Sequence, residues 1–251
     1  MIHIDSEGQG PNLILLHGWG MNSGIWEKLV PSLTPYFQLH RVDLPGYGFS
    51  QPCTPMAWDA MMEQLAARLP CGHLLGWSLG GLMAQQIAQR YPHQVLSLIT
   101  VASSAHFVQS PSWPGMKEEV LKLFAKGLES DYRKTLERFL AIQTLGAPDA
   151  RADIAQIKKS LNQRPLPSLQ ILHQGLLWLE SVDLRRVIPE IACPWLQVYG
   201  ALDAIVPKDS MHAHQVISSA QQVMIDKASH APFISHSQQF IGEILNFLEV
   251  A

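Results

Sequence analysis

Short strand patterns that stop at glycine or proline alternate with helical patterns along most of the chain. The first, residues 12–17, is a continuous apolar run that ends at Gly18-Trp19-Gly20, which is typical of a strand buried on both faces. Further strands are expected at 38–43, 73–77, 95–102, 195–200 and 222–226. Apolar residues at three- and four-residue spacing predict helices at 57–69, 82–91 and 237–248. This alternation predicts an α/β fold, with a mostly parallel sheet and helices on both faces.

One long stretch between the fourth and fifth of these strands departs from the alternation. It has little strand pattern, and prolines separate its helical patterns, which lie at 115–129, 131–145, 150–161 and 168–181. The 251 residues fit one domain with an insertion better than two independent domains. We therefore expect an α/β body, residues 1–110 and 185–251, that is interrupted by a helical cap, residues 111–184.

Composition excludes several classes of protein. Hydrophobic residues make up 47% and charged residues 16%, which excludes a disordered chain. The net charge of −3 lacks the basic balance of a duplex nucleic-acid binder. We see neither a signal-peptide pattern nor an apolar run long enough to span a membrane, and so expect a cytoplasmic protein with no membrane partner. Cys53, Cys71 and Cys193 are too few for a disulfide framework or a four-ligand zinc site, and we expect them to be reduced and buried.

Gly76-Trp77-Ser78-Leu79-Gly80 matches the pattern G-x-S-x-G, and its context gives the match weight. A predicted buried strand leads into it and a predicted amphipathic helix leads out, which is the setting of a nucleophile elbow. Glycines are needed on either side because a Cβ atom there would collide with the neighbouring backbone. The motif predicts that Ser78 is a nucleophile.

A serine hydroxyl needs a histidine base that is oriented by a carboxylate, and on this architecture the chain order is serine, acid, histidine. His230 follows the last predicted strand and Asp203 follows the one before it, so both are expected at the same sheet edge as Ser78. The alternatives are Asp209, Asp226 and Asp183 for the acid and His236 for the base. His212 and His214 form an H-x-H pair without a third ligand nearby, so a surface pair is favoured over a metal site.

An ester-cleaving serine also needs two backbone N–H groups to hold the developing oxyanion. One is expected from Leu79, the residue after the nucleophile. The other is expected from the loop after the first buried strand, where Trp19 is the candidate. His17 at the start of that loop is interpreted as a structural brace.

Five segments together resemble the α/β-hydrolase superfamily over nearly the whole chain: 17–20, 43–50, 76–81, 200–203 and 229–233. Within that superfamily, the chain resembles the pimeloyl-acyl-carrier-protein methyl ester esterases of biotin synthesis. Trp113-Pro114-Gly115 and the stretch 137–144 in the cap carry the more specific part of this resemblance.

The resemblance implies a serine carboxylesterase that removes the methyl ester of pimeloyl-acyl-carrier protein and also accepts short-chain esters. The triad mechanism needs neither cofactor nor metal, and we expect a monomer. It implies substrate contacts from Trp19, Ser78, Leu79, Phe139, Leu140, Ala141, Ile142, Gln143 and His230. A general carboxylesterase and a carbon–carbon bond hydrolase with the same triad remain alternatives. A hydrolase-fold ligand receptor is a further alternative from another functional class.

The charge of the predicted cap differs from that of the body. Residues 111–190 carry a small excess of basic residues, whereas the rest of the chain is acidic. A basic cap face could steer and dock an acidic acyl carrier protein. The candidates for this contact are Arg133, Lys134, Arg138, Arg151, Lys158 and Lys159. A solvated helix surface is the alternative interpretation of the same charges.

Overall fold

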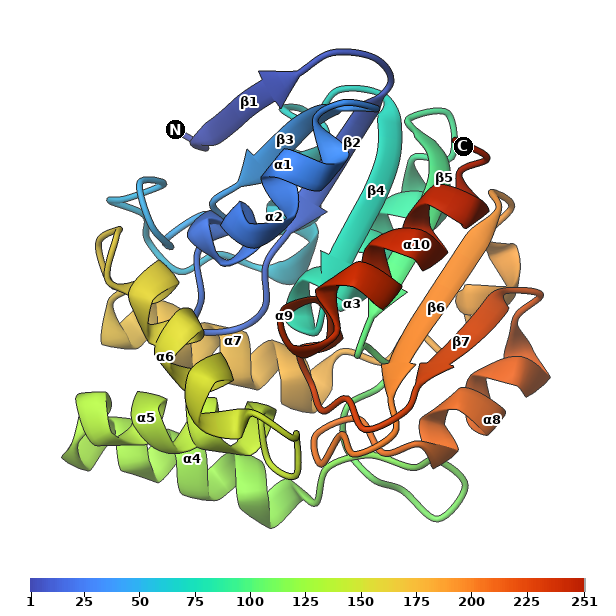
Figure 1. Ribbon diagram of the computed structural model, residues 1–251. Helices are drawn as coiled ribbons and strands as arrows, with labels where there is room; N and C mark the ends of the chain where they lie inside the picture. Colours follow the sequence, from blue (N-terminus) through green and yellow to red (C-terminus); the bar gives the residue numbers. More distant parts are fainter. Residues whose placement is uncertain (251) are drawn as a thin grey trace.

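The computed structural model describes residues 1–250, with the exception of the side chain of Arg133. Its centre is a seven-stranded sheet in the order β1-β3-β2-β4-β5-β6-β7 (Figure 1). The strands are β1 (Ile4–Gly8), β2 (Asn12–Leu16), β3 (Gln38–Val42), β4 (Gly72–Trp77), β5 (Val95–Val101), β6 (Trp195–Gly200) and β7 (Gln221–Ile225). All neighbouring pairs are parallel except β1 with β3, so the predicted α/β fold with a mostly parallel sheet is confirmed.

The sequence patterns missed the first strand. β1 has the sequence Ile4-Asp5-Ser6-Glu7-Gly8, and all five residues remain at least partly exposed. It pairs only with β3, antiparallel, at the edge of the sheet. An edge strand needs neither a continuous apolar run nor two covered faces, so the pattern that predicts inner strands does not find it.

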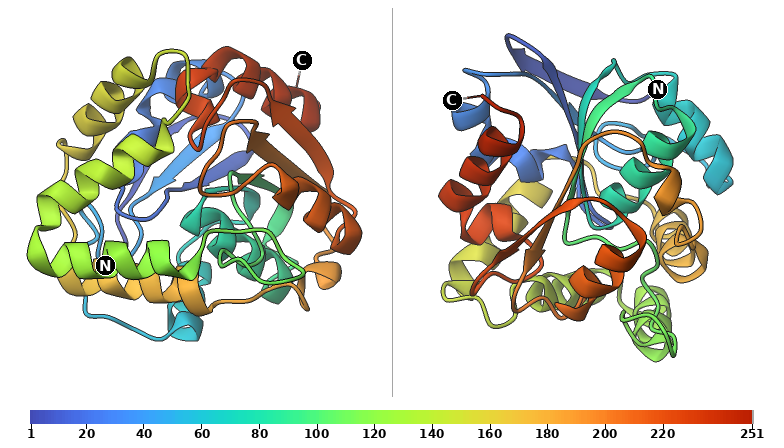
Figure 2. Two further views of the ribbon diagram at one scale, coloured as in Figure 1. Left: turned by 90° about the horizontal axis from the view of Figure 1, so that it is seen from below. Right: turned by 90° about the vertical axis from the view of Figure 1, so that its right-hand side faces the viewer.

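Helices cover both faces of the sheet (Figure 2). Leu13 and Leu15 of β2 belong to one apolar core, whereas Ile14 and Leu16 belong to the other, as alternation along a strand requires. The first core also contains residues of η1 (Ser23–Leu29), α1 (Val30–Leu33), α9 (Pro232–Ser235) and α10 (Ser237–Phe247). The second is covered by α2 (Trp58–Ala66), α3 (Leu79–Arg90) and α8 (Asp209–Ile217), with η2 (Ile188–Glu190) nearby.

Four helices between β5 and β6 form a layer over the carboxyl ends of the strands (Figure 1). They are α4 (Glu118–Ser130), α5 (Tyr132–Gln143), α6 (Ala150–Leu161) and α7 (Leu169–Ser181), and together they are called the cap below. Asp131 and Ser168 cap the first turns of α5 and α7, since their side chains accept hydrogen bonds from the N–H groups of Lys134 and Ile171. The cap therefore closes the sheet edge at which Ser78 lies.

Two smaller expectations are wrong. The first cap helix begins at Glu118 rather than at 115, because Trp113 and Met116 bridge back to Ser110 and Val108. The cysteines are free thiols, but Cys71 is exposed and Cys53 and Cys193 are only partly buried.

Within residues 1–250, none of the helices combines the length and the apolar character that a membrane span requires.

Candidate active site

Ser78 lies in the turn between β4 and α3, where its backbone has a φ of 55° and a ψ of −119°. A positive φ is uncommon for a residue with a side chain and costs free energy. Two hydrogen bonds hold it: the Ser78 N–H donates to the Val101 carbonyl at 2.9 Å, and the Ser78 carbonyl accepts from Ser103 Oγ at 2.8 Å. The turn is therefore held rigidly, as a nucleophile elbow requires.

The two glycines of the motif meet the steric requirement that the sequence predicts. A Cβ atom on Gly76 would lie 2.3 Å from the carbonyl oxygen of Gly80. A Cβ atom on Gly80 would lie 2.4 Å from the carbonyl oxygen of Leu16, in β2. Both contacts are with backbone, which cannot move aside as a flexible side chain could. Larger residues at these two positions would therefore displace the turn that carries Ser78.

Three side chains from different parts of the chain form one line of hydrogen bonds. Ser78 Oγ lies 2.9 Å from His230 Nε2, and His230 Nδ1 lies 2.8 Å from Asp203 Oδ2. An Nδ1–H that donates to Asp203 leaves Nε2 free to accept the proton of Ser78. The other carboxylate oxygen, Asp203 Oδ1, accepts from the N–H groups of Ile205 at 2.7 Å and Val206 at 3.0 Å. The arrangement can activate a serine hydroxyl for attack on an acyl carbon.

The backbone of His230 is tied to both the cap and the body. Its N–H donates to the Gln143 carbonyl, at the end of α5, at 3.0 Å. Its carbonyl accepts from Trp77 Nε1 at 2.8 Å. His230 has no exposed surface and Ser78 is only 3% exposed. The three side chains are thus sealed beneath the cap in this conformation.

The alternative acids and bases lie elsewhere. Asp209 begins α8, Asp226 directly follows β7, and Asp183 pairs with Arg185 at 2.6 Å. His236 Nδ1 contacts the hydroxyl of its neighbour Ser235. The structure therefore brings Asp203 and His230, rather than these alternatives, to Ser78.

The interpretation of His212 and His214 as a surface pair is wrong for His214. His214 is 1% exposed, its Nε2 accepts from the N–H of Ala105 at 2.9 Å, and its Nδ1–H donates to the Ser210 carbonyl. Burial lowers the pKa of His214 to about 4, so the ring is neutral at pH 7. Within the part of the chain that the structure describes, no group of three or more His, Cys, Asp or Glu side chains is placed to hold a metal ion.

The two candidate oxyanion donors border Ser78 on different elements. Leu79 is the first residue of α3, so its N–H has no acceptor within that helix. The loop of Trp19 lies against Ser78, since a Cβ atom on Gly18 would be 3.2 Å from Ser78 Cβ. The Trp19 side chain points into the cap, where its Nε1 donates to the Leu172 carbonyl at 2.9 Å.

His17 braces this loop. Its Nδ1–H donates to the Gly18 carbonyl at 2.8 Å, and its Nε2 accepts from the N–H of Leu44 at 3.1 Å. Burial lowers the pKa of His17 to about 4, although the nearby Asp43 carboxylate acts in the opposite direction. A neutral ring is the form that can make both bonds, so the brace is intact at pH 7.

The five predicted substrate contacts in α5 do not share one face of the helix. Phe139 packs against Trp19 with ring centroids 4.7 Å apart, and the carbonyl of Gln143 holds His230. Leu140 belongs to the core on the other side of the helix. Ala141 and Ile142 line a groove of about 440 Å³ between α4 and α5. Five consecutive residues span more than one helical turn, so they cannot all face Ser78.

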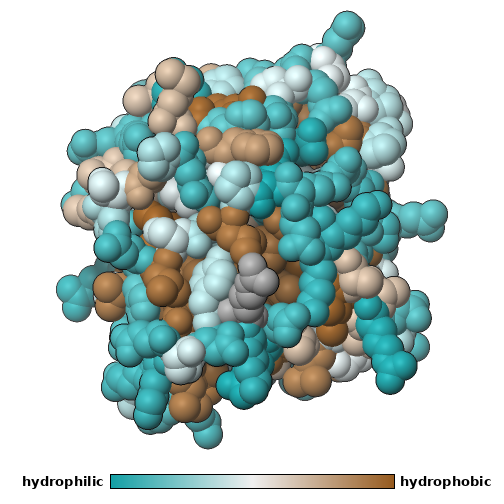
Figure 3. Space-filling model, turned by 90° about the vertical axis from the view of Figure 1, so that its left-hand side faces the viewer, coloured by the Kyte–Doolittle hydropathy of each residue, from teal (hydrophilic) through white to brown (hydrophobic). Residues whose placement is uncertain are grey.

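The candidate docking residues lie on α5 and α6. Lys134, Arg138, Arg151 and Lys159 are exposed, whereas Lys158 is partly buried and pairs with Glu137 at 2.8 Å. The side chain of Arg133 lies outside the described part of the structure. Figure 3 views the molecule from the left of Figure 1 and shows hydrophobic side chains in the middle of this face, bordered by hydrophilic ones. Four of the six candidate cations are thus exposed to solvent.

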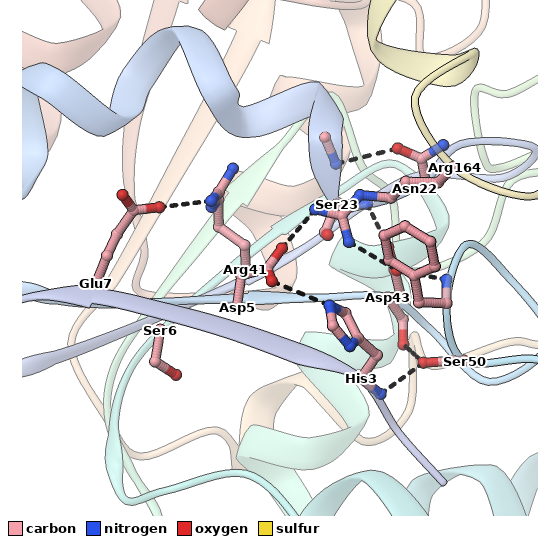
Figure 4. Close-up of polar contacts among 12 residues, drawn as sticks. His3, Asp5, Ser6, Glu7, Asn22, Ser23, Arg41, Asp43, Ser50 and Arg164 are labelled. Atoms are coloured by element: carbon pink, nitrogen blue, oxygen red, sulfur yellow. Dashed lines mark hydrogen bonds and ion pairs between the residues drawn. The ribbon is translucent and has the colours of Figure 1, made fainter.

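Sequence reasoning missed a buried ion pair that joins the cap to the body. Arg164, between α6 and α7, pairs with Asp43 at 3.0 Å and with Asp5 of β1 (Figure 4). Asp43 has no exposed surface. An aspartate at the end of a predicted strand is a signal that such a partner exists, but the sequence does not indicate which cation supplies it.

Comparison with known proteins agrees with this geometry. The family model described as "alpha/beta hydrolase fold" matches residues 11–237. Proteins named pimeloyl-[acyl-carrier protein] methyl ester esterase are similar over nearly their whole length. The one from Aeromonas hydrophila is 47% identical, covering 98% of this chain and 99% of the relative. The one from Pectobacterium carotovorum is 44% identical, covering 99% and 98%.

Solved structures show the same fold at lower identity. An esterase from Exiguobacterium antarcticum has a TM-score of 0.89 at 21% identity, covering 99% of this chain and 95% of that one. A bromoperoxidase from Bacillus anthracis has a TM-score of 0.88 at 20% identity, with the same coverage. The chain therefore belongs to the α/β-hydrolase family and, within it, to the family of the pimeloyl-[acyl-carrier protein] methyl ester esterases.

Proposed function

We propose that this chain is a serine carboxylesterase that hydrolyses the methyl ester of pimeloyl-acyl-carrier protein. The products would be methanol and pimeloyl-acyl-carrier protein, and short-chain esters would be accepted as well. The hydrogen-bonded line Ser78–His230–Asp203 carries the proposal of ester hydrolysis. The names of relatives that are 40–47% identical support the choice of substrate. The three cysteines are free thiols, which supports a location in the reducing cytoplasm.

In the first half of the reaction, Ser78 Oγ attacks the ester carbonyl carbon while His230 Nε2 takes the hydroxyl proton. Negative charge develops on the carbonyl oxygen as the tetrahedral intermediate forms. The N–H groups of Leu79 and Trp19 are the proposed donors to that oxygen. Asp203 stabilises the protonated imidazole, since its carboxylate lies 2.8 Å from His230 Nδ1. The imidazolium then gives its proton to the departing methoxy group, and methanol leaves.

In the second half, water hydrolyses the acyl-enzyme. His230 removes a proton from the water, the hydroxide attacks the acyl carbon, and the same donors hold the oxyanion. The intermediate collapses to the free carboxylic acid, and Ser78 regains its proton from His230. Each step uses only groups of this chain and water.

Access to Ser78 requires a shift of cap side chains. Ser78 is 3% exposed, and Phe139 and Leu172 contact the Trp19 side chain beside it. A Cβ atom on Gly20 would lie 3.1 Å from Leu136 of α5. Because so little of Ser78 is exposed and these cap side chains pack around Trp19, we propose that the cap opens to admit the acyl chain.

The carrier protein is proposed to dock on the exposed cations of the cap, which are Lys134, Arg138, Arg151 and Lys159, with Lys158 and Arg133 as further candidates. Acyl carrier proteins are acidic, so these charges would steer the complex together. Arg138 also lines the groove between α4 and α5, which places a cation beside an apolar surface. The acidic face of the carrier would contact the cations, and its acyl chain would contact the apolar groove.

Complementation of a biotin auxotroph that lacks this esterase tests the proposed function. The wild-type chain should restore growth without biotin, and the Ser78→Ala variant, expressed to the same level, should not. If the wild type hydrolyses small esters but does not restore growth, the general carboxylesterase replaces the carrier-specific enzyme. Growth restored by Ser78→Ala would refute the role of Ser78.

A further inference from the structure

The loop of residues 17–24 carries the proposed oxyanion donor Trp19, and it contacts the cap at several points. Trp19 Nε1 donates to the carbonyl of Leu172 in α7. Asn22 Nδ2 donates to the carbonyl of Leu161, the last residue of α6, at 3.1 Å. A Cβ atom on Gly24 would lie 3.2 Å from the carbonyl oxygen of Ser160. The loop is thus packed directly beneath the end of α6.

Arg164 holds that end of α6 against the body. Its two terminal nitrogens pair with different carboxylates, Asp43 at 3.0 Å and Asp5, and its side chain is only 9% exposed (Figure 4). The guanidinium also lies 5.0 Å from the ring centroid of Phe49. The planar guanidinium of Arg164 thus contacts two carboxylates and one aromatic ring. These contacts together restrict the backbone position of Arg164.

Asp43 links this ion pair to the loop itself. Its Oδ1 accepts from the N–H of Ser23 at 2.7 Å, while its Oδ2 accepts from Arg164 and from the N–H of Phe49 at 2.8 Å. Ser23 has no exposed surface and directly follows Asn22. Through the next residue, Leu44, the same segment holds His17 at the other end of the loop. Asp43, which pairs with Arg164, and its neighbour Leu44 therefore fix both ends of the loop.

We propose that Arg164 is a positioning residue for the oxyanion loop. By clamping the end of α6 to Asp43 and Asp5, it fixes residues 22–24 and holds the Trp19 N–H at its place beside Ser78. This inference rests on the proposed function, because it concerns the donor that the ester reaction would use. An oxyanion exists only in the transition state and the intermediate, so a displaced donor lowers kcat and leaves substrate binding nearly unchanged.

The test compares Arg164→Lys and Arg164→Gln with matched changes of Arg41. Arg41 of β3 pairs with Glu7 of β1, 2.5 Å apart, so it is an arginine–carboxylate pair in the same part of the body that, among the described residues, does not contact the cap. We expect Arg164→Gln to lower kcat for p-nitrophenyl acetate by about 100-fold, and Arg164→Lys by about 10-fold, with KM within about threefold of wild type. Arg41→Lys and Arg41→Gln should keep kcat within about twofold.

Two further measurements separate positioning from stability. Asn22→Ala removes the other tie to α6 without leaving a buried charge, so it should also lower kcat with KM unchanged. A trifluoromethyl ketone, which mimics the tetrahedral intermediate, should bind the Arg164 variants more weakly by the factor by which kcat/KM falls. Circular dichroism and thermal melting give the folded fraction by which each rate is normalised.

Wild-type kcat and inhibitor affinity in folded Arg164→Lys and Asn22→Ala would overturn the inference, as would equal losses in the Arg41 variants. A wild-type enzyme that hydrolyses neither p-nitrophenyl acetate nor the carrier-bound ester would instead overturn the proposed function. The two failures are therefore distinguishable.

Discussion

The hydroxyl of Ser78 is the group on which turnover should depend most. Replacing it with hydrogen in Ser78→Ala removes the nucleophile, and we expect kcat for p-nitrophenyl acetate to fall by about 10⁴–10⁶-fold. Ser229→Ala is a matched control, because Ser229 is also buried and adjoins His230, and its hydroxyl has no hydrogen-bond partner among the described residues. Steady-state kinetics should show nearly wild-type kcat in that variant. Comparable losses in both would contradict the assignment of Ser78.

Two buried histidines should make the fold sensitive to acid. Burial lowers the pKa of His17 and of His214 from 6.5 to about 4. Between these values the unfolded chain binds more protons than the folded one. The contribution of the two neutral histidines to the free energy of unfolding is therefore fully present above pH 6.5 and is lost as the pH falls toward 4. At pH 5.5 the loss should be about 1.4 kcal/mol per histidine relative to pH 7.5.

Urea unfolding at pH 7.5 and pH 5.5 measures this loss. In His214→Gln, which keeps a side chain able to accept from the N–H of Ala105, the loss between the two pH values should be smaller than in the wild type by about 1.4 kcal/mol. An unchanged loss in the variant would show that His214 does not contribute.

At the scale of elements, the packing of α7 on the oxyanion loop should be intolerant of one added methyl group. A Cβ atom on Gly175 would lie 2.5 Å from Trp19 Cδ1 and 2.9 Å from the hydroxyl of Tyr47. Gly175→Ala should therefore displace Trp19 or α7, lower stability by about 1–3 kcal/mol and lower kcat by about 10-fold or more.

Gly242→Ala provides the control, because it places the same methyl group in a helix, α10, with nothing within 4 Å. It should leave kcat unchanged and raise stability by up to about 1 kcal/mol through helix propensity. Thermal melting and p-nitrophenyl acetate hydrolysis distinguish the two variants. Equal behaviour would mean that the contact between α7 and Trp19 is not needed.

The helices and strands also show which structural features can be predicted from local sequence patterns. Inner strands such as β2 and β4 are covered on both faces, so their apolar runs predict them to within a residue. The strand-turn-helix context likewise leads to Ser78. β1 lacks such a run, and the partner of Asp43 lies 121 residues away in the chain. Burial of His214 and the clamp by Arg164 arise from tertiary packing, which no local spacing encodes.

At the scale of the whole molecule, the charge of the cap should affect KM for the carrier-bound ester but not for a small ester. The double variant Arg138→Glu/Arg151→Glu reverses two exposed cations of the cap. We expect KM for the carrier-bound ester to rise by about 10-fold or more, while kinetics with p-nitrophenyl acetate stay unchanged. Arg68→Glu/Lys208→Glu changes the net charge equally on the body and should leave both substrates unaffected. Similar effects of the two double variants would refute a docking site on the cap.

The most direct test of the central claim is the intact mass of the carrier protein after incubation with the enzyme. Pimeloyl-acyl-carrier protein methyl ester should lose the mass of one methylene group when treated with the wild type and none when treated with Ser78→Ala, with methanol released in equal amount. An unchanged carrier mass, under conditions in which the same wild-type sample hydrolyses p-nitrophenyl acetate, would contradict the claim.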